Sequence, residues 1–294
     1  MSRSTFLGLL AALAAALIGS GWQITSRHGV TTTLGPIELA VLRYGVPALV
    51  LLPVLLRSTG LFPVGIPRSR LAMLVVGGGL PFGLVVMAGA QWAPAAHIGV
   101  FASGSLPLFT ALGARWVDGT PITGLRLAGL LMVAAGLAGF GFIDPAGLAR
   151  TWRGDLCFLF AAMLWAVYTL ASRRAGLSPW QGTALVNAWS ALLLLPLVLV
   201  VGTPRLLTAP WTDVAWQALG QGVMAGLLGL ATYLAAVAHL GAARASLSAA
   251  LVPLLTACGA AALLGEPLLP QTAAAAAVVA LGVLLAAFSS QTGR

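Results

Sequence analysis

Runs of about twenty predominantly apolar residues follow one another along almost the whole of this 294-residue chain. A helix needs roughly 20 such residues to cross the hydrocarbon core of a bilayer, which is about 30 Å thick. Apolar residues make up 60% of the chain and charged residues 7%, a balance that a water-soluble domain of this length could not place on its surface. The runs do not alternate polar and apolar residues as barrel strands would. We therefore predict an all-α integral membrane protein.

Arg, Pro and Gly residues punctuate the apolar runs and divide the chain into ten predicted transmembrane helices. The third and fourth helices, and the eighth and ninth, would be joined by tight hairpins. The predicted spans are residues 5–26, 35–56, 71–92, 95–115, 121–142, 154–173, 180–201, 213–238, 243–264 and 271–288.

The basic residues of the chain indicate its orientation in the membrane. All fifteen are Arg, and they are scattered between the apolar runs, so no basic patch is present to bind nucleic acid. Cytoplasmic loops retain more Arg and Lys than outer loops. With the N-terminus inside, ten Arg fall in cytoplasmic segments and four in outer loops, while Arg43 falls within the second span. We expect a multi-pass protein of the cell inner membrane with both termini in the cytoplasm.

An internal repeat relates the two halves of the chain. A shift of 146 positions places Pro107 on Pro253 and Gly136 on Gly282, together with other Gly and Pro residues. Each half, residues 1–143 and residues 154–294, would hold five spans, an odd number, so the two would insert with opposite orientations. Inverted repeats of this kind recur in transporters that bind their substrate near the bilayer midplane.

The repeated motifs resemble those of the drug/metabolite transporter superfamily, in particular its ten-span EamA-type exporters. The first copy departs from the pattern because Thr120 stands where the second copy has an acid. The resemblance implies ten helices around a central cavity and export of amino acids or related metabolites, with aromatic amino acids named first. The motifs that carry it are Leu106-Pro107-Leu108, Gly119-Thr120-Pro121 and Gly136, and Val252-Pro253-Leu254, Gly265-Glu266-Pro267 and Gly282.

Polar and aromatic side chains inside the predicted spans are candidates to line the substrate cavity, because a polar group in lipid is costly unless it faces protein or water. A serine could instead satisfy the carbonyl that a helix Pro frees, and the aromatic rings could instead be core packing. The candidate cavity residues are Trp22, Gln23, Met87, Gln91, Ser103, Ser105, Trp165, Tyr168, Asn187, Tyr233, Ser246 and Ser248. The candidate gating or helix-breaking residues are Pro81, Pro107 and Pro253.

Several further charged and titratable side chains lie within or beside the predicted spans. Glu38 and Arg43 could form a membrane ion pair or an outer gate, or could anchor the second span structurally. His97 and His239 lie near the predicted hairpins, where we expect water to reach them. Asp155 is placed in a connection or at a span end.

The few charged residues, and their positions, limit the classes of substrate and of function that we expect. The absence of a carboxylate at the centre of any predicted span favours neutral or zwitterionic cargo over efflux of organic cations, which is the alternative. A membrane enzyme would need convergent acids, histidines or metal ligands, and these residues are few and dispersed. We expect an alternating-access transporter, a monomer whose partners are a small-molecule substrate and the lipid bilayer, with no catalytic residue, metal site or cofactor.

Overall fold

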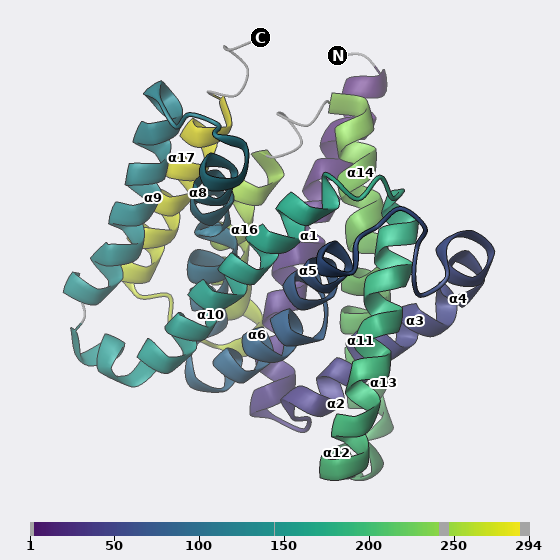
Figure 1. The fold of residues 1–294 in the computed structure, drawn as a ribbon. Helices are drawn as coiled ribbons and strands as arrows, with labels where there is room; N and C mark the ends of the chain where they lie inside the picture. Colours follow the sequence, from purple (N-terminus) through teal and green to yellow (C-terminus); the bar gives the residue numbers. More distant parts are fainter. Residues whose placement is uncertain (1–2, 144, 241–246, 289–294) are drawn as a thin grey trace.

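The computed structural model describes residues 3–143, 145–240 and 247–288, and these residues form helices without a strand. Figure 1 shows that the start of α1 (Arg3–Thr31) and the end of α17 (Pro270–Phe288) lie at the same end of the molecule. The expected all-helical architecture is confirmed for the described residues.

Several helices of the first half are interrupted. The second apolar segment consists of α2 (Pro36–Ala40), the π-helical η1 (Val41–Gly45) and α3 (Val46–Val50), followed after a 52° bend by α4 (Leu52–Val54) and η2 (Leu55–Thr59). The next elements are α5 (Arg68–Gly78), α6 (Leu80–Trp92), α7 (Ala95–His97), the π-helical η3 (Ile98–Gly104), α8 (Leu106–Asp118) and α9 (Gly124–Ile143).

The second half begins with α10 (Pro145–Ser172), which starts nine residues before the predicted sixth span. The expected connection at 143–153 is therefore wrong for residues 145–153, which are helical. The half continues with α11 (Pro179–Val201), α12 (Pro204–Thr208), α13 (Trp211–Gln217), the π-helical η4 (Ala218–Leu228), α14 (Gly229–Leu240) and α16 (Leu247–Leu264), and ends with α17.

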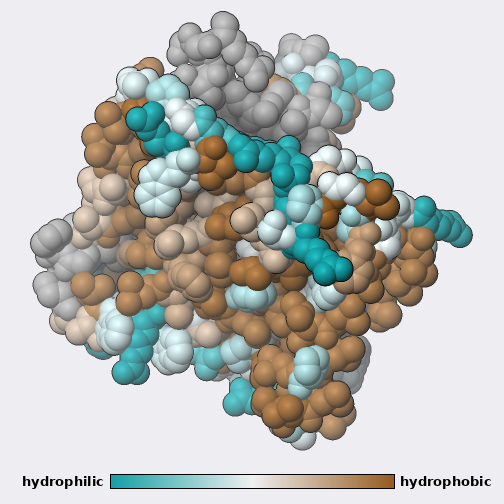
Figure 2. Space-filling view, in the orientation of Figure 1, coloured by the Kyte–Doolittle hydropathy of each residue, from teal (hydrophilic) through white to brown (hydrophobic). Residues whose placement is uncertain are grey.

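Six helical segments among the described residues are long and apolar enough to cross a bilayer, and a seventh is present if the bent pair of residues 36–50 and 52–59 is one span. The apolar stretches of α9 and α16 are shorter. Exposed apolar side chains also cover the surface, and Leu199 and Val200 of α11 are 84% and 85% exposed. The face in Figure 2 is mostly hydrophobic below a hydrophilic band that crosses its upper part. Lipid is the solvent that suits such a surface.

Equivalent helices of the two halves pack in the same way. Helix α1 packs on α14 and α16, and α10 packs on α6 and α8, which stand at the corresponding places of the first half. Helices α9 and α17 lie side by side (Figure 1), and glycine permits their close approach. A Cβ atom added at Gly282 would lie 2.7 Å from the carbonyl oxygen of Gly129.

The break between α5 and α6 is compensated by side chains from other helices. Gly79 interrupts the segment two residues before Pro81. The amide of Leu80 donates to the hydroxyl of Ser190 at 3.0 Å. The hydroxyl of Tyr44 donates to the carbonyl oxygen of Gly79 at 2.6 Å, in addition to the amide of Gly83 at 3.1 Å. An interrupted helix in a membrane needs partners of this kind, because lipid supplies none.

Candidate functional site

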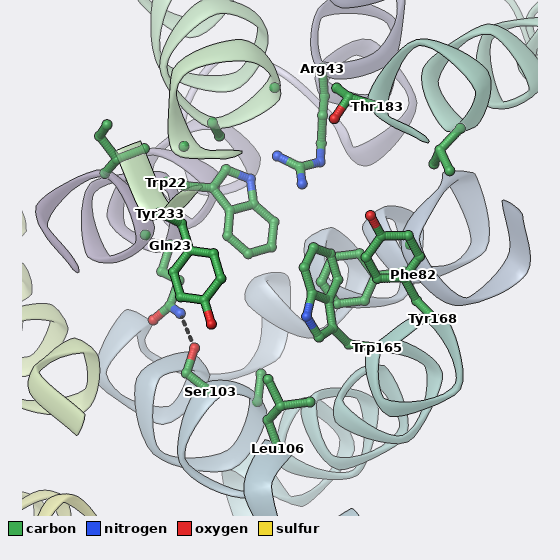
Figure 3. A pocket seen from close by; sticks show the side chains of 18 of the residues that line it. Trp22, Gln23, Arg43, Phe82, Ser103, Leu106, Trp165, Tyr168, Thr183 and Tyr233 are labelled. Carbon is green, nitrogen blue, oxygen red and sulfur yellow. Dashed lines mark hydrogen bonds between the residues drawn. The ribbon is translucent and has the colours of Figure 1, made fainter. Parts of the chain in front are cut away.

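A cavity of about 340 Å³ lies between helices of both halves. Its walls come from α1, η1, α5, α6, η3, α8, α10, α11, η4, α14 and α16. Small-molecule sites usually measure about 300–1,000 Å³ and are lined mainly by apolar and aromatic side chains with a few polar groups. This cavity fits that description, and Figure 3 shows the side chains that surround it.

Aromatic rings form a continuous wall along the cavity, defined here as Trp22, Phe82, Trp165 and Tyr168. The ring centroids of Trp22 and Phe82 are 5.9 Å apart, those of Phe82 and Trp165 4.7 Å, and those of Trp165 and Tyr168 5.1 Å. Trp165 and Tyr168 share a face of α10 because they are three residues apart. The aromatic wall offers flat, apolar surface to a ring-bearing molecule.

Arg43 brings a positive charge to one end of the aromatic wall. Its guanidinium carbon lies 4.3 Å from the centroid of the Trp22 ring, a cation–π contact, and Figure 3 shows the group facing the cavity. Arg43 is only 8% exposed, and its Nε and Nη1 atoms are buried without a hydrogen-bond partner among the described residues.

The Glu38–Arg43 ion pair, one of the two predicted readings, is not formed. Oε2 of Glu38 instead accepts from the amide of Gly35 at 3.1 Å and caps the start of α2. Arg43 lies in η1, where the wider π-helical turn changes which residues share a face with those that precede it. Such turns often occur at functional sites.

A network of hydrogen bonds borders the cavity on the side of Trp22 and Gln23, which precede Arg27 on α1. We call the group of Trp22, Gln23, Ser26, Ser103, Gln221 and Thr256 the polar layer. Trp22 Nε1 donates to Gln221 at 2.8 Å, and Gln221 Nε2 donates to Ser26 at 2.9 Å. Gln23 donates to Ser103 at 2.6 Å and accepts from Thr256 at 2.8 Å. The polar layer therefore ties α1 to η3, η4 and α16.

Two ion pairs connect the halves at nearly equivalent positions. Nε of Arg27, near the end of α1, donates to Glu266 of the Gly-Glu-Pro motif at 2.9 Å, and Glu266 also accepts from the amide of Ala95 at 2.8 Å. The second pair joins Arg174 of the second half, just after α10, to Asp118 of the first half, beside the Gly-Thr-Pro motif. The first pair is partly buried and the second is more exposed.

The predicted site residues divide into two groups. Trp22, Gln23, Ser103, Trp165, Tyr168, Asn187 and Tyr233 line the cavity. The others do not line it, or are not described. Met87 is fully buried in the core, Gln91 is exposed, and the hydroxyl of Ser105 donates to Phe101 of its own helical segment. Ser246 lies outside the described residues, as does the side chain of Ser248.

The predicted helix-breaking prolines occupy different places in their helices. Pro81 and Pro107 stand in the first turn of α6 and α8, where a missing N–H is tolerated, whereas Pro253 lies inside α16. Phe82 and Arg43 line the cavity but were not among the predicted cavity residues. Phe82 has no sequence signal beyond its apolar character. Arg43 was considered for an ion pair or an outer gate, and its position within a span was a signal for the cavity as well, because an ionisable residue inside a span is functional by default.

His97 and Asp155 form a second buried polar pair away from the cavity. Nδ1 of His97 lies 2.7 Å from Oδ1 of Asp155, and the Thr151 hydroxyl donates to Oδ2 at 2.8 Å. The prediction that water reaches His97 is wrong, since His97 is 9% exposed and Asp155 4%. The additional first turns of α10 place Asp155 inside the helix and not in a connection.

Comparison with known proteins gives a family match and several similar chains. The model of the EamA-like transporter family matches residues 6–142 and again residues 152–288, so both ends of the second match lie 146 positions after those of the first. An uncharacterized protein of Pseudomonas aeruginosa is 34% identical over 191 residues, which cover 62% of this chain and 63% of that relative. A solved structure titled only as the crystal structure of a protein superposes with a TM-score of 0.63 at 21% identity over 100% of both chains, which supports the fold alone.

Proposed function

This chain belongs to the EamA-like transporter family, whose members move small molecules across membranes, and from this membership we propose a specific transport function. The protein exports amino acids, with aromatic amino acids as the preferred class, across the inner membrane. The observation that carries the choice of aromatic substrates is the aromatic wall along a cavity of about 340 Å³. Organic cations are a poorer match, because the guanidinium of Arg43 would repel them.

We also propose that ten spans form two inverted five-helix repeats, residues 1–143 and 154–294, and that the protein works by alternating access as a monomer. Support for the repeat comes from the double family match and from the equivalent packing of α1 and α10. The polar layer and the Arg27–Glu266 pair support a state closed at the Arg27 end. If these contacts broke and equivalent contacts formed at the Arg174 end, the cavity would close at the Arg174 end and open at the Arg27 end.

Transport of labelled compounds into liposomes tests the proposed function. We expect uptake of tryptophan and competition by other aromatic amino acids, but weaker competition by aliphatic amino acids and none by quaternary amines. Each measurement is made with and without a pH gradient, and empty liposomes supply the background. Uptake confined to the quaternary amines, and seen only with the gradient, would favour the organic-cation alternative.

Cysteine labelling tests the inverted repeat. Thr32 follows α1 and Arg173 follows α10, and both are exposed. In a background where Cys157 and Cys258 are replaced by Ala, we expect Thr32→Cys and Arg173→Cys to react with a membrane-impermeant maleimide from opposite sides of the membrane. A third variant with its cysteine at Ser2 should react from the Arg173 side. Reaction of positions 32 and 173 from the same side would disprove the inverted arrangement.

A further inference from the structure

We propose that Arg43 binds the negatively charged end of the transported molecule, so that the cavity selects aromatic carboxylates and does not require an amino group. This inference rests on the proposed transport function and specifies the chemical class of its substrate. It concerns a single side chain, in the π-helical η1, which faces the cavity (Figure 3).

The charge of Arg43 is not balanced within the described part of the protein. The residues that line the cavity include this Arg and no Asp, Glu or Lys. Glu38, the acid nearest in sequence, is occupied at the start of α2. The rings of Trp22 and Tyr44 lie 4.3 Å and 5.6 Å from the guanidinium carbon, but Nε and Nη1 have no hydrogen-bond partner among the described residues. A buried charge without an anionic partner is unfavourable, and a ligand that brings an anion relieves that penalty.

The position of Arg43 relative to the aromatic wall sets the orientation of the ligand. The Trp22 ring lies beneath the guanidinium and is followed by the rings of Phe82, Trp165 and Tyr168. A molecule whose flat body lies along the wall therefore has its acidic end within reach of Arg43. Carboxylates match the planar donor arrangement of a guanidinium, which makes them the anion that this geometry favours.

The same charge balance distinguishes a carboxylate from an amino acid. The ammonium group of a zwitterion needs acceptors, and the described lining offers neutral ones only, such as Gln23, Thr183 and Asn187. The side-chain oxygen of Gln23 already accepts from the Thr256 hydroxyl, and no anionic side chain among the described lining residues balances the charge of an ammonium group. Hence a monoanion complements the cavity better than a zwitterion, and a monocation opposes it.

Three indole compounds of similar size separate these classes. Indole-3-propionate carries the carboxylate alone, tryptophan carries both groups, and tryptamine carries the amine alone. We expect purified protein in detergent to bind labelled indole-3-propionate at least as tightly as tryptophan, and tryptamine at least tenfold more weakly. Arg43→Gln should weaken binding of both carboxylates at least tenfold and leave tryptamine unchanged or tighter. Arg43→Lys, which keeps the charge, should recover part of the carboxylate binding.

Arg153→Gln is the matched control, because Arg153 also lies over a tryptophan ring, that of Trp152 at 5.4 Å, but lines no part of the cavity. It should bind all three compounds as the wild type does. Thermal unfolding separates lost binding from lost folding: indole-3-propionate should raise the unfolding temperature of the wild type and of Arg153→Gln, but not that of a folded Arg43→Gln.

Two results would overturn the assignment of Arg43. One is wild-type protein that binds tryptamine as tightly as indole-3-propionate, and the other is Arg43→Gln that retains wild-type affinity for the carboxylates. Failure of the transport function is a separate result. If the wild-type protein binds indole-3-propionate through Arg43 but liposomes accumulate none of the three compounds, the proposed binding site stands and the proposed transport function is wrong.

Discussion

Replacement of Trp165 by Ala should weaken binding and transport of an aromatic substrate by about 30-fold to a thousandfold. The Trp165 ring is the middle of the aromatic wall, in contact with Phe82 on one side and Tyr168 on the other. Loss of a large apolar contact costs about 1.5–3 kcal/mol, and loss of ring stacking adds about 0.5–1.5 kcal/mol. Because about 1.4 kcal/mol corresponds to a factor of ten in affinity, the effect is readily measured by competition binding.

Two further variants show whether the effect comes from the ring itself. Trp165→Phe keeps an aromatic face and should recover most of the affinity, whereas Trp180→Ala removes a 42% exposed ring at the start of α11, outside the cavity, and should change little. Each variant is checked for a single peak in size exclusion. Loss of folded protein in Trp165→Ala, with no binding defect in the fraction that folds, would identify the ring as core packing.

The sequence was most informative about helix positions and least informative about which side of each helix faces the cavity. Apolar runs predict spans well because lipid demands them, and α11 and α17 begin within one residue of their predicted starts. The start of α10 was missed because the residues from Pro145 to Arg153 include two Arg, which end an apolar run but do not end a helix. Hydropathy and helicity are separate properties, and they diverge where a helix leaves the membrane.

The side chains of the site also show that the sequence does not tell which side of a helix faces the cavity. Gln23, Trp165 and Asn187 line the cavity as predicted, but Met87 and Gln91 do not, although all five lie within apolar runs. Met87 and Gln91 stand four residues apart on α6 and so lie on similar sides of that helix, whereas the cavity receives Phe82. Packing against the other helices decides which side of α6 faces the cavity. The capping role of Glu38, in contrast, could have been read from its place three residues after the Gly that precedes Pro36.

The His97–Asp155 pair should be one of the largest single contributors to folding stability, since Asp155→Ala is expected to lower the free energy of unfolding by about 2–4 kcal/mol. This range lies between the loss of a hydrogen bond to a charged group and the breaking of a buried ion pair. The substitution leaves both Nδ1 of His97 and the hydroxyl of Thr151 without the carboxylate that they contact. Thermal or denaturant unfolding in detergent measures the loss.

The pair also matters for the cavity, because α10 carries Trp165 and the segment after His97 carries Ser103. A double-mutant cycle with His97→Ala, Asp155→Ala and both together isolates their interaction, and we expect a coupling of at least about 1 kcal/mol. Asp213→Ala, in the first turn of α13, is the matched acidic control and should change stability by less than about 1 kcal/mol. Additive effects of the two single variants would show that the contact does not bind α10 to the segment that leads into η3, and that the cavity walls are aligned by apolar packing instead.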